Sequence, residues 1–447
     1  MRRLFIAGLS FLLLSVAMVA GPARAGLSLV RDAEIDHIIR LHAAPLFEQA
    51  GLDPQSVDIL LVNDPTLNAF VAGGQKLFLH TGLLIRSESP AQLMGVIAHE
   101  AGHIAGGHLA RKRESLEDAT AQMIAAQVLG LALGAATGRG DAAVAAASLG
   151  QEMALRGFLS YSRSEESAAD QAALDYMDRA GVPADGLLSF MEILEEQELL
   201  STSRQDPYLR THPLTRQRVE TLRRHVERSD GSEDVRPELE RLHARMRAKL
   251  SGFLEPPQRA LGRFKGRDDP AALYGRAIAE FRAGRTDEAL AGMDRLMATD
   301  PLEPAFLHGT RGQILFESGR LDEAVAAYRK AVEGAPLASL LRVELAHALT
   351  ERGREGDHAD AADLLNRAID DGEGDYVFAW HLMAVAEGRQ GNMGRAALAM
   401  AEQALLRGDR AQAAHQAERA RRELPGDARV ARRRLADITL RLKHGGE

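Results

Sequence analysis

A segment that repeats in the second half of the chain limits the possible folds more than any other feature. Residues 281–301 (FRAGRTDEALAGMDRLMATDP) and 316–336 (FESGRLDEAVAAYRKAVEGAP) align at a spacing of 35 residues. The alignment superimposes small and helix-breaking residues at fixed offsets: Gly284 on Gly319, Ala289 on Ala324 and Pro301 on Pro336. A repeat of this length holds one pair of helices, and such pairs bury their apolar faces only by stacking on their neighbours.

Weaker copies extend this array to the end of the chain. They cover residues 351–370 and 389–405, and Gly408, Asp409 and Pro425 mark a last degenerate unit. Because an irregular helical bundle would not keep glycine and proline at fixed offsets, the spacing favours tetratricopeptide repeats. We therefore expect an α-solenoid over residues 271–447 that binds extended peptides or partner proteins on its concave face.

Charge and cysteine content exclude several functional classes. The 447 residues include 55 Lys and Arg against 63 Asp and Glu, a net charge of −8, which argues against general nucleic-acid binding. The absence of cysteine excludes disulfides, thiolate metal sites and cysteine nucleophiles. The chain is too long for one ordinary core, so we expect two domains.

The first 25 residues have the layout of a secretory signal peptide. A basic start (Arg2 and Arg3) precedes an apolar run over residues 4–20, and a small-x-small cleavage pattern ends at Ala25. An uncleaved membrane anchor is the alternative interpretation. Cleavage would remove three arginines and change the net charge from −8 to −11. We expect a secreted protein, which in a Gram-negative bacterium would lie in the periplasm.

Helices and short strands alternate before the repeats. Apolar residues at helical spacing predict a helix over residues 31–50, and short apolar runs at 57–62, 68–71 and 76–80 predict a small β-sheet. Ser89 and Gln92 have the spacing of a capping box and predict the start of a helix that runs to about Arg113. Residues 229–270 are polar and have several breaks, so we interpret them as a linker around one charged helical stretch.

The sequence VIAHEAGH within that capped helix suggests a metal site. His99 and His103 are four residues apart, so both imidazoles lie on one helix face and can converge on one Zn²⁺. Glu100 follows the first histidine and is placed to take a proton from the attacking water. An accidental match is the alternative, but apolar neighbours predict a buried helix, where unpartnered histidine and glutamate would be costly.

A third metal ligand must come from elsewhere in the chain. The three-histidine class of zinc peptidases needs a histidine at position 109, where this chain has Leu109, with His108 one residue out of register. The best candidate is Glu166, on a helix expected over residues 164–179, because Asp170 lies one turn beyond it and can orient a ligand imidazole. Glu165 is its rival, since adjacent side chains point about 100° apart on a helix.

Two further features remain open from the residues alone. His212 precedes a proline, which favours an extended turn, and a turn histidine of this kind is usually a surface residue. Residues 119–138 carry no charge over 20 positions, enough to span a bilayer. A span between His103 and Glu166 would need a return crossing, for which only residues 142–151 are available, so we reject it. A helical hairpin over the active site or against a membrane surface, or a plain core helix, remains.

Taken together, these motifs resemble a known protein family. The sequences NAFVAGGQKLFLHTGLL, HEAGH, SRSEESAAD and THPLTRQR occur in that order ahead of the repeats. The chain resembles BepA-type periplasmic zinc metallopeptidases of the HtpX/CAAX-protease-type gluzincin family. The resemblance implies one Zn²⁺ per chain held by His99, His103 and Glu166, with Glu100 as base and Asp170 behind the ligands.

The same resemblance assigns roles to other residues. It implies that His212 occupies the fourth zinc position in a latent state until a loop moves, with Arg218 nearby. It also implies that Asn68, Ala69 and Phe70 form an edge strand that pairs with the substrate backbone. The implied fold class is α+β and mainly α: a gluzincin-type metallopeptidase domain with a small β-sheet, followed by the α-solenoid.

The resulting expectations concern domains, function and partners. We expect a signal peptide at residues 1–25, a zinc metallopeptidase domain at 26–228, the linker at 229–270 and the repeats at 271–447. The expected function is a periplasmic endopeptidase that degrades unfolded or misassembled outer-membrane proteins and aids their assembly. Its repeats would contact the outer-membrane assembly machinery, without nucleic acid and with membrane contact peripheral at most. The alternatives are a repeat-based assembly chaperone with a mainly structural zinc site and, ranked lowest, a cell-wall amidase.

Overall fold

The structure is a computed structural model that describes most of the chain. Its described residues are 28–111, 162–198, 206–229 and 235–444, with positions 114, 115, 117, 118, 120, 121 and 123–125 between them. The expected signal peptide and most of the uncharged stretch over 119–138 lie outside these residues. None of the helices within the described part combines the length and apolar character that crossing a membrane requires.

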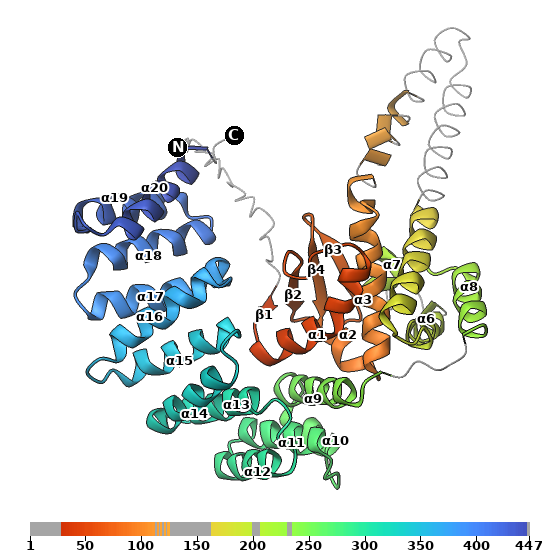
Figure 1. Ribbon diagram of the computed structural model, residues 1–447, viewed down its shortest axis with the longest axis horizontal. Coiled ribbons are helices and arrows are strands. Elements are labelled where there is room, and N and C mark those ends of the chain that lie inside the picture. The colour runs from red at the N-terminus through yellow and green to blue at the C-terminus, as the bar shows by residue number, and fades with distance from the viewer. Residues whose placement is uncertain are drawn as a thin grey trace, which may run out of the picture.

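A four-stranded sheet lies inside the N-terminal half, with helices beside and below it (Figure 1). Its strands are β1 (Leu29–Val30), β2 (Asp58–Val62), β3 (Ala69–Ala72) and β4 (Lys76–His80). They lie in the order β1-β2-β4-β3, with β2 parallel to β4 and β3 antiparallel to it. The sheet expected from the three apolar runs is therefore present, and β3 is an end strand of the described sheet.

Helices cover this sheet and enclose the first core. They are α1 (Ala33–Gln49), α2 (Thr81–Arg86), α3 (Pro90–Ala105), a helix over 162–180, α6 (Asp185–Glu198), α7 (Pro207–Thr211) and α8 (Arg216–Val226). The Ser89 hydroxyl caps α3 by accepting from the Gln92 backbone N–H at 3.3 Å, and the Gln92 side chain accepts from the Glu88 N–H at 2.7 Å. The expected helix start is confirmed, but α3 stops at Ala105 rather than near Arg113, because Gly107 has a φ of +63°.

Close packing against α6 holds α3 in the middle of this core. A Cβ added to Gly95 of α3 would lie 2.8 Å from the Leu187 Cβ, and one added to Gly186 would lie 2.3 Å from the Ala91 carbonyl carbon. Both glycines therefore allow the two helix backbones to approach more closely than side chains would permit. The result is a fixed, fully buried position for the helix that contains the HEAGH sequence.

The segment expected to be a linker contains two helices, α9 (Pro237–Leu254) and α10 (Pro257–Arg263). Helix α9 packs against α1 and α2 on one side and against the first repeat helix on the other. It has buried polar side chains as well as apolar ones, among them His243, Arg245 and Lys249. This helix therefore connects the two halves of the molecule as a packed element, which a polar, flexible segment would not do.

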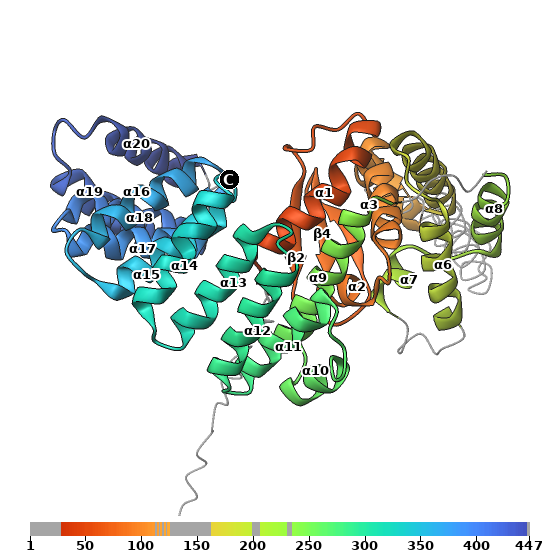
Figure 2. The same cartoon turned by 60° about the horizontal axis from the view of Figure 1, so that its bottom comes forward.

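The second half is an array of paired helices that curves around one side of the first half (Figures 1 and 2). Its helices are α11 (Pro270–Arg282), α12 (Thr286–Thr299), α13 (Pro304–Glu317), α14 (Leu321–Gly334), α15 (Ser339–Arg352), α16 (Asp357–Asp370), α17 (Val377–Arg389), α18 (Met393–Leu406), α19 (Arg410–Glu423) and α20 (Arg429–His444), with a 3₁₀ turn at Glu373–Asp375. Gly284 and Gly319, which the repeat aligned, both have a positive φ, of 80° and 76°, in the turn inside a helix pair. The solenoid prediction is therefore confirmed, and the glycines are kept because this backbone conformation favours them.

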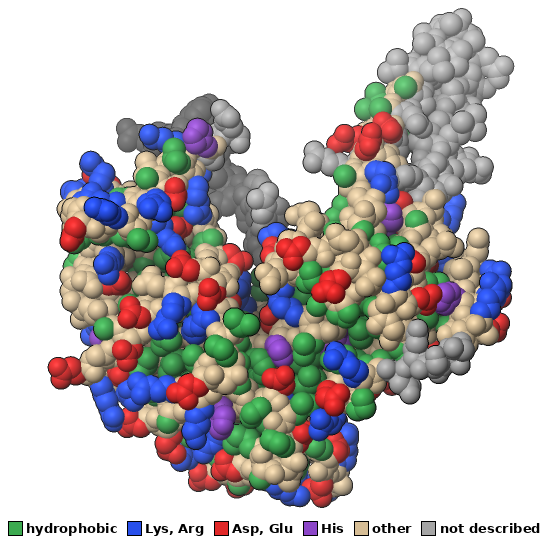
Figure 3. Space-filling view, in the orientation of Figure 1, with side chains coloured by type: hydrophobic (Ala, Val, Ile, Leu, Met, Phe, Trp, Pro, Cys, Tyr) green, Lys and Arg blue, Asp and Glu red, His purple; other side chains and the backbone are tan. Residues whose placement is uncertain are grey.

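The start of the first domain contacts the inner side of this array. Ala33 packs with Phe306, Ala331 and Leu341 in a small apolar cluster, and Arg31 lies over the Tyr376 ring at 4.7 Å. Elsewhere a hollow separates α18–α20 from the first domain (Figure 3). The two halves thus meet where α1 and α9 contact the first and middle repeats.

Candidate metal centre

Helix α3 presents the two histidines and the glutamate of HEAGH in the protein interior. His99 and Glu100 are 0% exposed, and His103 is 8% exposed. The Nε2 atoms of His99 and His103 lie 3.1 Å apart, so the imidazoles converge as the four-residue spacing predicted. Two nitrogens this close would repel one another through their lone pairs unless a proton or a cation lay between them.

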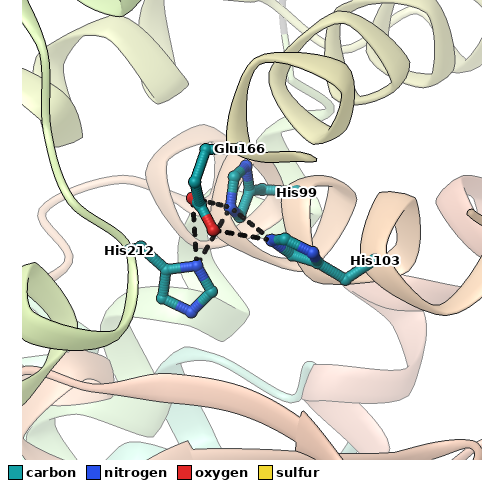
Figure 4. A group of neighbouring side chains, drawn as sticks. All are labelled: His99, His103, Glu166 and His212. Atoms are coloured by element: carbon teal, nitrogen blue, oxygen red, sulfur yellow. Dashed lines mark hydrogen bonds and ion pairs between the residues drawn. The ribbon is translucent and has the colours of Figure 1, made fainter. Parts of the chain in front are cut away.

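Glu166 and His212 complete a group of four possible metal ligands, whose coordinating nitrogen and oxygen atoms are called the donors below (Figure 4). Glu166 extends from the helix over 162–180, and its carboxylate lies 3.4 Å from His99 Nε2 and 3.5 Å from His103 Nε2. His212 follows α7, and its Nδ1 lies 3.2 Å from Glu166 Oε2 and 3.3 Å from His99 Nε2. All four side chains are buried, and their donor atoms lie within 4.8 Å of one another.

Several of these separations are close to the edges of a coordination tetrahedron. A metal bound at 2.0–2.1 Å by four ligands in a tetrahedron sets them about 3.3 Å apart. Four distances among His99 Nε2, His103 Nε2, His212 Nδ1 and Glu166 Oε2 fall between 3.1 and 3.4 Å, and the other Glu166 oxygen lies 3.5 Å from His103 Nε2. Three imidazoles and one carboxylate are also ligand types that suit a divalent transition metal. The residues present therefore fit a metal ion, with His212 at the fourth corner.

Glu100 lies beside this group without being part of it. Neither of its carboxylate oxygens has a hydrogen-bond partner among the described residues, and its Oε1 lies 3.4 Å from His212 Nε2. Burial raises the pKa of the Glu100 carboxyl group. A desolvated carboxylate with free lone pairs can accept a proton from a water molecule held next to it.

Asp170 and Arg218 form a buried pair behind the donors. Asp170 accepts two hydrogen bonds from the Arg218 guanidinium, at 2.5 and 2.8 Å, and its Oδ1 lies 3.0 Å from His99 Nδ1. Burial opposes ionisation of Asp170, but these contacts with Arg218 hold its pKa down, at about 2. The carboxylate therefore stays charged and fixes the His99 ring with Nε2 directed at the other donors.

His212 is held by its own chain segment. Its backbone N–H donates to the Tyr208 carbonyl at 2.8 Å, and its ring stacks on the Tyr208 ring at 4.6 Å. The same segment contacts Leu67, two residues before β3, because Leu67 accepts from the Tyr208 N–H at 3.4 Å and donates to Asp206 at 2.9 Å. The residues alone favoured a surface histidine here, whereas the structure buries it to 7% exposure.

The chain is similar to known proteins. Residues 30–226 match peptidase family M48. The first half of the chain is therefore similar to an M48 peptidase domain. The chain is 27% identical over 396 residues to the beta-barrel assembly-enhancing protease of Escherichia coli K12, covering 86% of this chain and 78% of that protein. It is 28% identical over 339 residues to the putative beta-barrel assembly-enhancing protease of Vibrio cholerae, covering 74% and 68%.

Two further similarities are more limited. A stretch of 71 residues is 38% identical to the mitochondrial metalloendopeptidase OMA1 of Arabidopsis thaliana, covering 16% of this chain and 14% of that protein. A chain of the Cut9–Hcn1 complex aligns at 12% identity over 81% of this chain and 96% of its own, with a TM-score of 0.26. The M48 match confirms the predicted resemblance and the predicted metallopeptidase class.

The structure also shows where the other residues predicted from the sequence lie. Asn68 is buried and precedes β3, and Ala69 and Phe70 lie within it, with Ala69 fully buried. Glu165, the rival third ligand, is outside the donor group and lies 3.6 Å from the Arg111 guanidinium. Of the two glutamates, Glu166 is the one that lies with His99, His103 and His212, as the spacing relative to Asp170 predicted.

Two residues beside the donors were not predicted from the sequence. His108 Nδ1 lies 2.8 Å from His103 Nδ1, although His108 had been considered only as a ligand out of register. Tyr208 is fully buried with no hydrogen bond to its hydroxyl from the described residues. The sequence signal for Tyr208 was its position four residues before His212, which itself precedes a proline.

Proposed function

We propose that this protein is a zinc-dependent endopeptidase of the bacterial periplasm. One observation supports this proposal above the others: donor atoms of His99, His103 and Glu166 converge beside the buried carboxylate of Glu100. The histidine-rich donor set suits zinc, and the expected signal peptide supports export. Asp170 and Arg218 would position the ligands.

The chemistry follows from the positions of the side chains. When bound, zinc acts as a Lewis acid that polarises the scissile carbonyl and makes water a stronger acid. Glu100 accepts the proton of the attacking water and delivers it to the leaving amine. Asp170, held by Arg218, keeps His99 in the orientation that the metal needs.

The substrate proposed here is an unfolded or misassembled outer-membrane protein. β3 pairs with β4 on one side only within the described sheet, so an extended peptide can add to its free edge next to Asn68, Ala69 and Phe70. The two bacterial relatives are named beta-barrel assembly-enhancing proteases, which indicates the class of protein that they serve. The repeats would then contact the client or the outer-membrane assembly machinery.

His212 would gate this activity. Its Nδ1 lies with the other ligand atoms and would take the fourth corner of the zinc site, which a catalytic site keeps open for water or substrate. Movement of His212 away from the donors would open that corner. In this state Glu100 would also lose its contact with His212 Nε2 and become available to the water.

Substitution of Glu100 by Gln tests whether the protein is a protease that uses Glu100 as its base. The change keeps the size of the side chain but removes the proton acceptor, so we expect proteolysis of casein, and any self-cleavage, to fall at least 100-fold while bound zinc stays at one per chain. Metal content is measured by atomic absorption on the purified protein. Full proteolysis by this variant would overturn the assignment of the base.

Substitution of His212 by Ala tests the gate. Opening the fourth corner should raise the proteolytic rate several-fold, and zinc affinity should fall because one ligand is lost. The rate is measured on casein at saturating zinc, so that occupancy does not limit it. A His212→Ala protein no more active than the unsubstituted chain would remove the gate from the proposal.

A second function is favoured by the closed donor set. Four protein ligands without an open position are typical of structural zinc sites, which suits an assembly chaperone that uses its repeats. In that case both the Glu100→Gln and the His212→Ala protein would prevent aggregation of an unfolded outer-membrane protein without either cleaving it. The Glu100→Gln protein would also have the same activities as the unsubstituted chain.

A further inference from the structure

The chain changes direction directly after the metal-binding helix. α3 ends at Ala105, and Gly107 has a φ of +63°, a left-handed conformation that favours glycine. A new helical segment begins at His108. In one continuous helix, residues five apart would lie about 140° apart around the axis and could not meet. The turn at Gly107 therefore allows His108 to lie back against His103.

The contact between these two histidines is close and buried. Their Nδ1 atoms lie 2.8 Å apart, their ring centroids lie 4.9 Å apart, and the rings are inclined by 80°. His108 is only 6% exposed. A hydrogen bond at this distance needs one nitrogen to donate and the other to accept.

The direction of this bond follows from the other nitrogen of His103. His103 Nε2 is the atom that faces His99 and Glu166, so it must keep its lone pair free for a metal ion. The proton of a neutral His103 then lies on Nδ1, which donates to His108 Nδ1. His108 is thus the acceptor, in the same way that Asp170 is placed at Nδ1 of His99.

The space for His108 is provided by the sequence around it. A Cβ added to Gly106 would lie 2.5 Å from His108 Nε2, so a larger residue at this position would displace the ring. Arg111 and Glu165 lie 3.6 Å from one another in the neighbouring segments. The Gly106-Gly107 pair therefore both turns the chain and makes room for the imidazole.

We propose that His108 is a positioning residue that holds the His103 imidazole in the tautomer and orientation required for metal binding. The inference rests on the proposed metal site and deepens it, because it assigns a partner to the second histidine of HEAGH. His108 acts through His103 and contacts neither substrate nor metal. Loss of such a partner typically weakens metal binding about 10- to 100-fold.

A comparison of three substitutions of His108 tests the role. Asparagine has its amide oxygen on Cγ, where histidine has Nδ1, so His108→Asn keeps an acceptor near the original position. His108→Gln moves the same group one bond further out, and His108→Ala removes it. Each is made in the Glu100→Gln background, so that self-cleavage does not interfere, and the dissociation constant for zinc is measured by competition with a chromogenic chelator.

The expected order of zinc affinity is His108 highest, then Asn, then Gln and Ala. We expect Ala and Gln to bind about 10- to 100-fold more weakly than the parent and Asn to recover most of that loss. The visible spectrum of the Co²⁺-loaded proteins should change in intensity for Ala and Gln and resemble the parent for Asn. A merely structural role would instead lower the thermal midpoint of the metal-free proteins without separating Asn from Gln.

Equal zinc affinities in all four proteins would overturn the positioning role, as would an Asn variant no better than Gln. Asn and Gln have the same polar group, so this comparison holds even where Ala fails to fold. A parent protein that binds no zinc would instead contradict the proposed function, and this inference with it.

Discussion

Arg218 lies where an unpaired charge could not be tolerated. Its side chain is 2% exposed, and it contacts the carboxylates of Asp170 and Glu166, which are 4% exposed. Burial opposes its positive charge, but the pair with Asp170 raises the pKa of the guanidinium still further. One cation thus compensates two buried anions next to the donor atoms.

Substitution of Arg218 by Met should destabilise the peptidase domain strongly. The change leaves Asp170 and Glu166 without their cation in a dry interior, which costs about 3–5 kcal/mol of unfolding free energy. Urea unfolding of the metal-free protein measures it. Arg223→Met on the same helix is the matched control, because Arg223 is 43% exposed and its loss should cost under about 0.5 kcal/mol. Similar midpoints for both variants would contradict the argument.

Local spacing predicted most of the donor set. His99 and His103 follow from a four-residue interval, and Glu166 from its interval to Asp170, because both intervals lie within single helices. His108 could not be found in this way. Its contact with His103 depends on a left-handed glycine that changes the helix direction, and periodicity does not indicate where such a turn directs a side chain.

At the scale of elements, two buried histidines, His42 of α1 and His243 of α9, lie where these helices pack together. This contact between α1 and α9 is called the seam. His42 Nδ1 donates to the Ile38 carbonyl at 2.6 Å, and His243 Nε2 donates to the Ser87 carbonyl at 2.9 Å. Their ring centroids lie 5.5 Å apart. Burial lowers the pKa of His42 to about 4, and burial together with His42 and the nearby Arg247 lowers that of His243 to about 3.

The seam should lose stability in acid. Between pH 6.5 and about 4 the unfolded chain binds protons that the folded histidines exclude, so the free energy of unfolding falls as pH falls. Each histidine contributes about 2 kcal/mol to the difference between pH 8 and pH 5. We expect His42→Leu to reduce that difference by about this amount in urea unfolding, and His415→Leu, at an exposed site on α19, to leave it unchanged. An unreduced pH dependence in His42→Leu would refute the account.

The same seam explains why residues 229–270 were interpreted as a linker. Part of the face that α9 buries consists of His243, Arg245 and Lys249, so its composition resembles that of a solvated helix. The carboxylates that compensate the two cations are Asp32 and Glu34, more than 200 residues earlier. A pattern within a window of a few turns cannot reveal a partner at that distance. Strand and helix positions with apolar faces were predicted well because their signal is local.

Across the whole molecule, one carboxylate joins three segments. Glu34 accepts from Arg245 Nε of α9 at 2.7 Å and from the Tyr274 hydroxyl of α11 at 2.6 Å. The Tyr274 hydroxyl also lies 2.6 Å from Thr310 Oγ1 of α13. Burial opposes the negative charge of Glu34, but Arg245 and Lys249 lower its pKa to about 2. The peptidase domain is therefore fixed to the repeats by a buried polar network.

Glu34→Ala should loosen the contact between the two domains. Arg245 and Lys249 would remain buried without this carboxylate, and we expect a loss of about 3–5 kcal/mol and a larger radius of gyration in small-angle X-ray scattering. Glu48→Ala, at an exposed position of the same helix, serves as the control. An unchanged scattering profile and unfolding midpoint for Glu34→Ala would show that other contacts alone hold the domains together.

The contact of Arg31 with the Tyr376 ring has a thermodynamic consequence for any ligand of the repeats. The peptidase domain already uses part of the inner surface on which such arrays bind peptides. A ligand that replaced Arg31 there would shift the equilibrium between attached and released domains. By reciprocity, release of the peptidase domain would increase affinity for that ligand by the same factor.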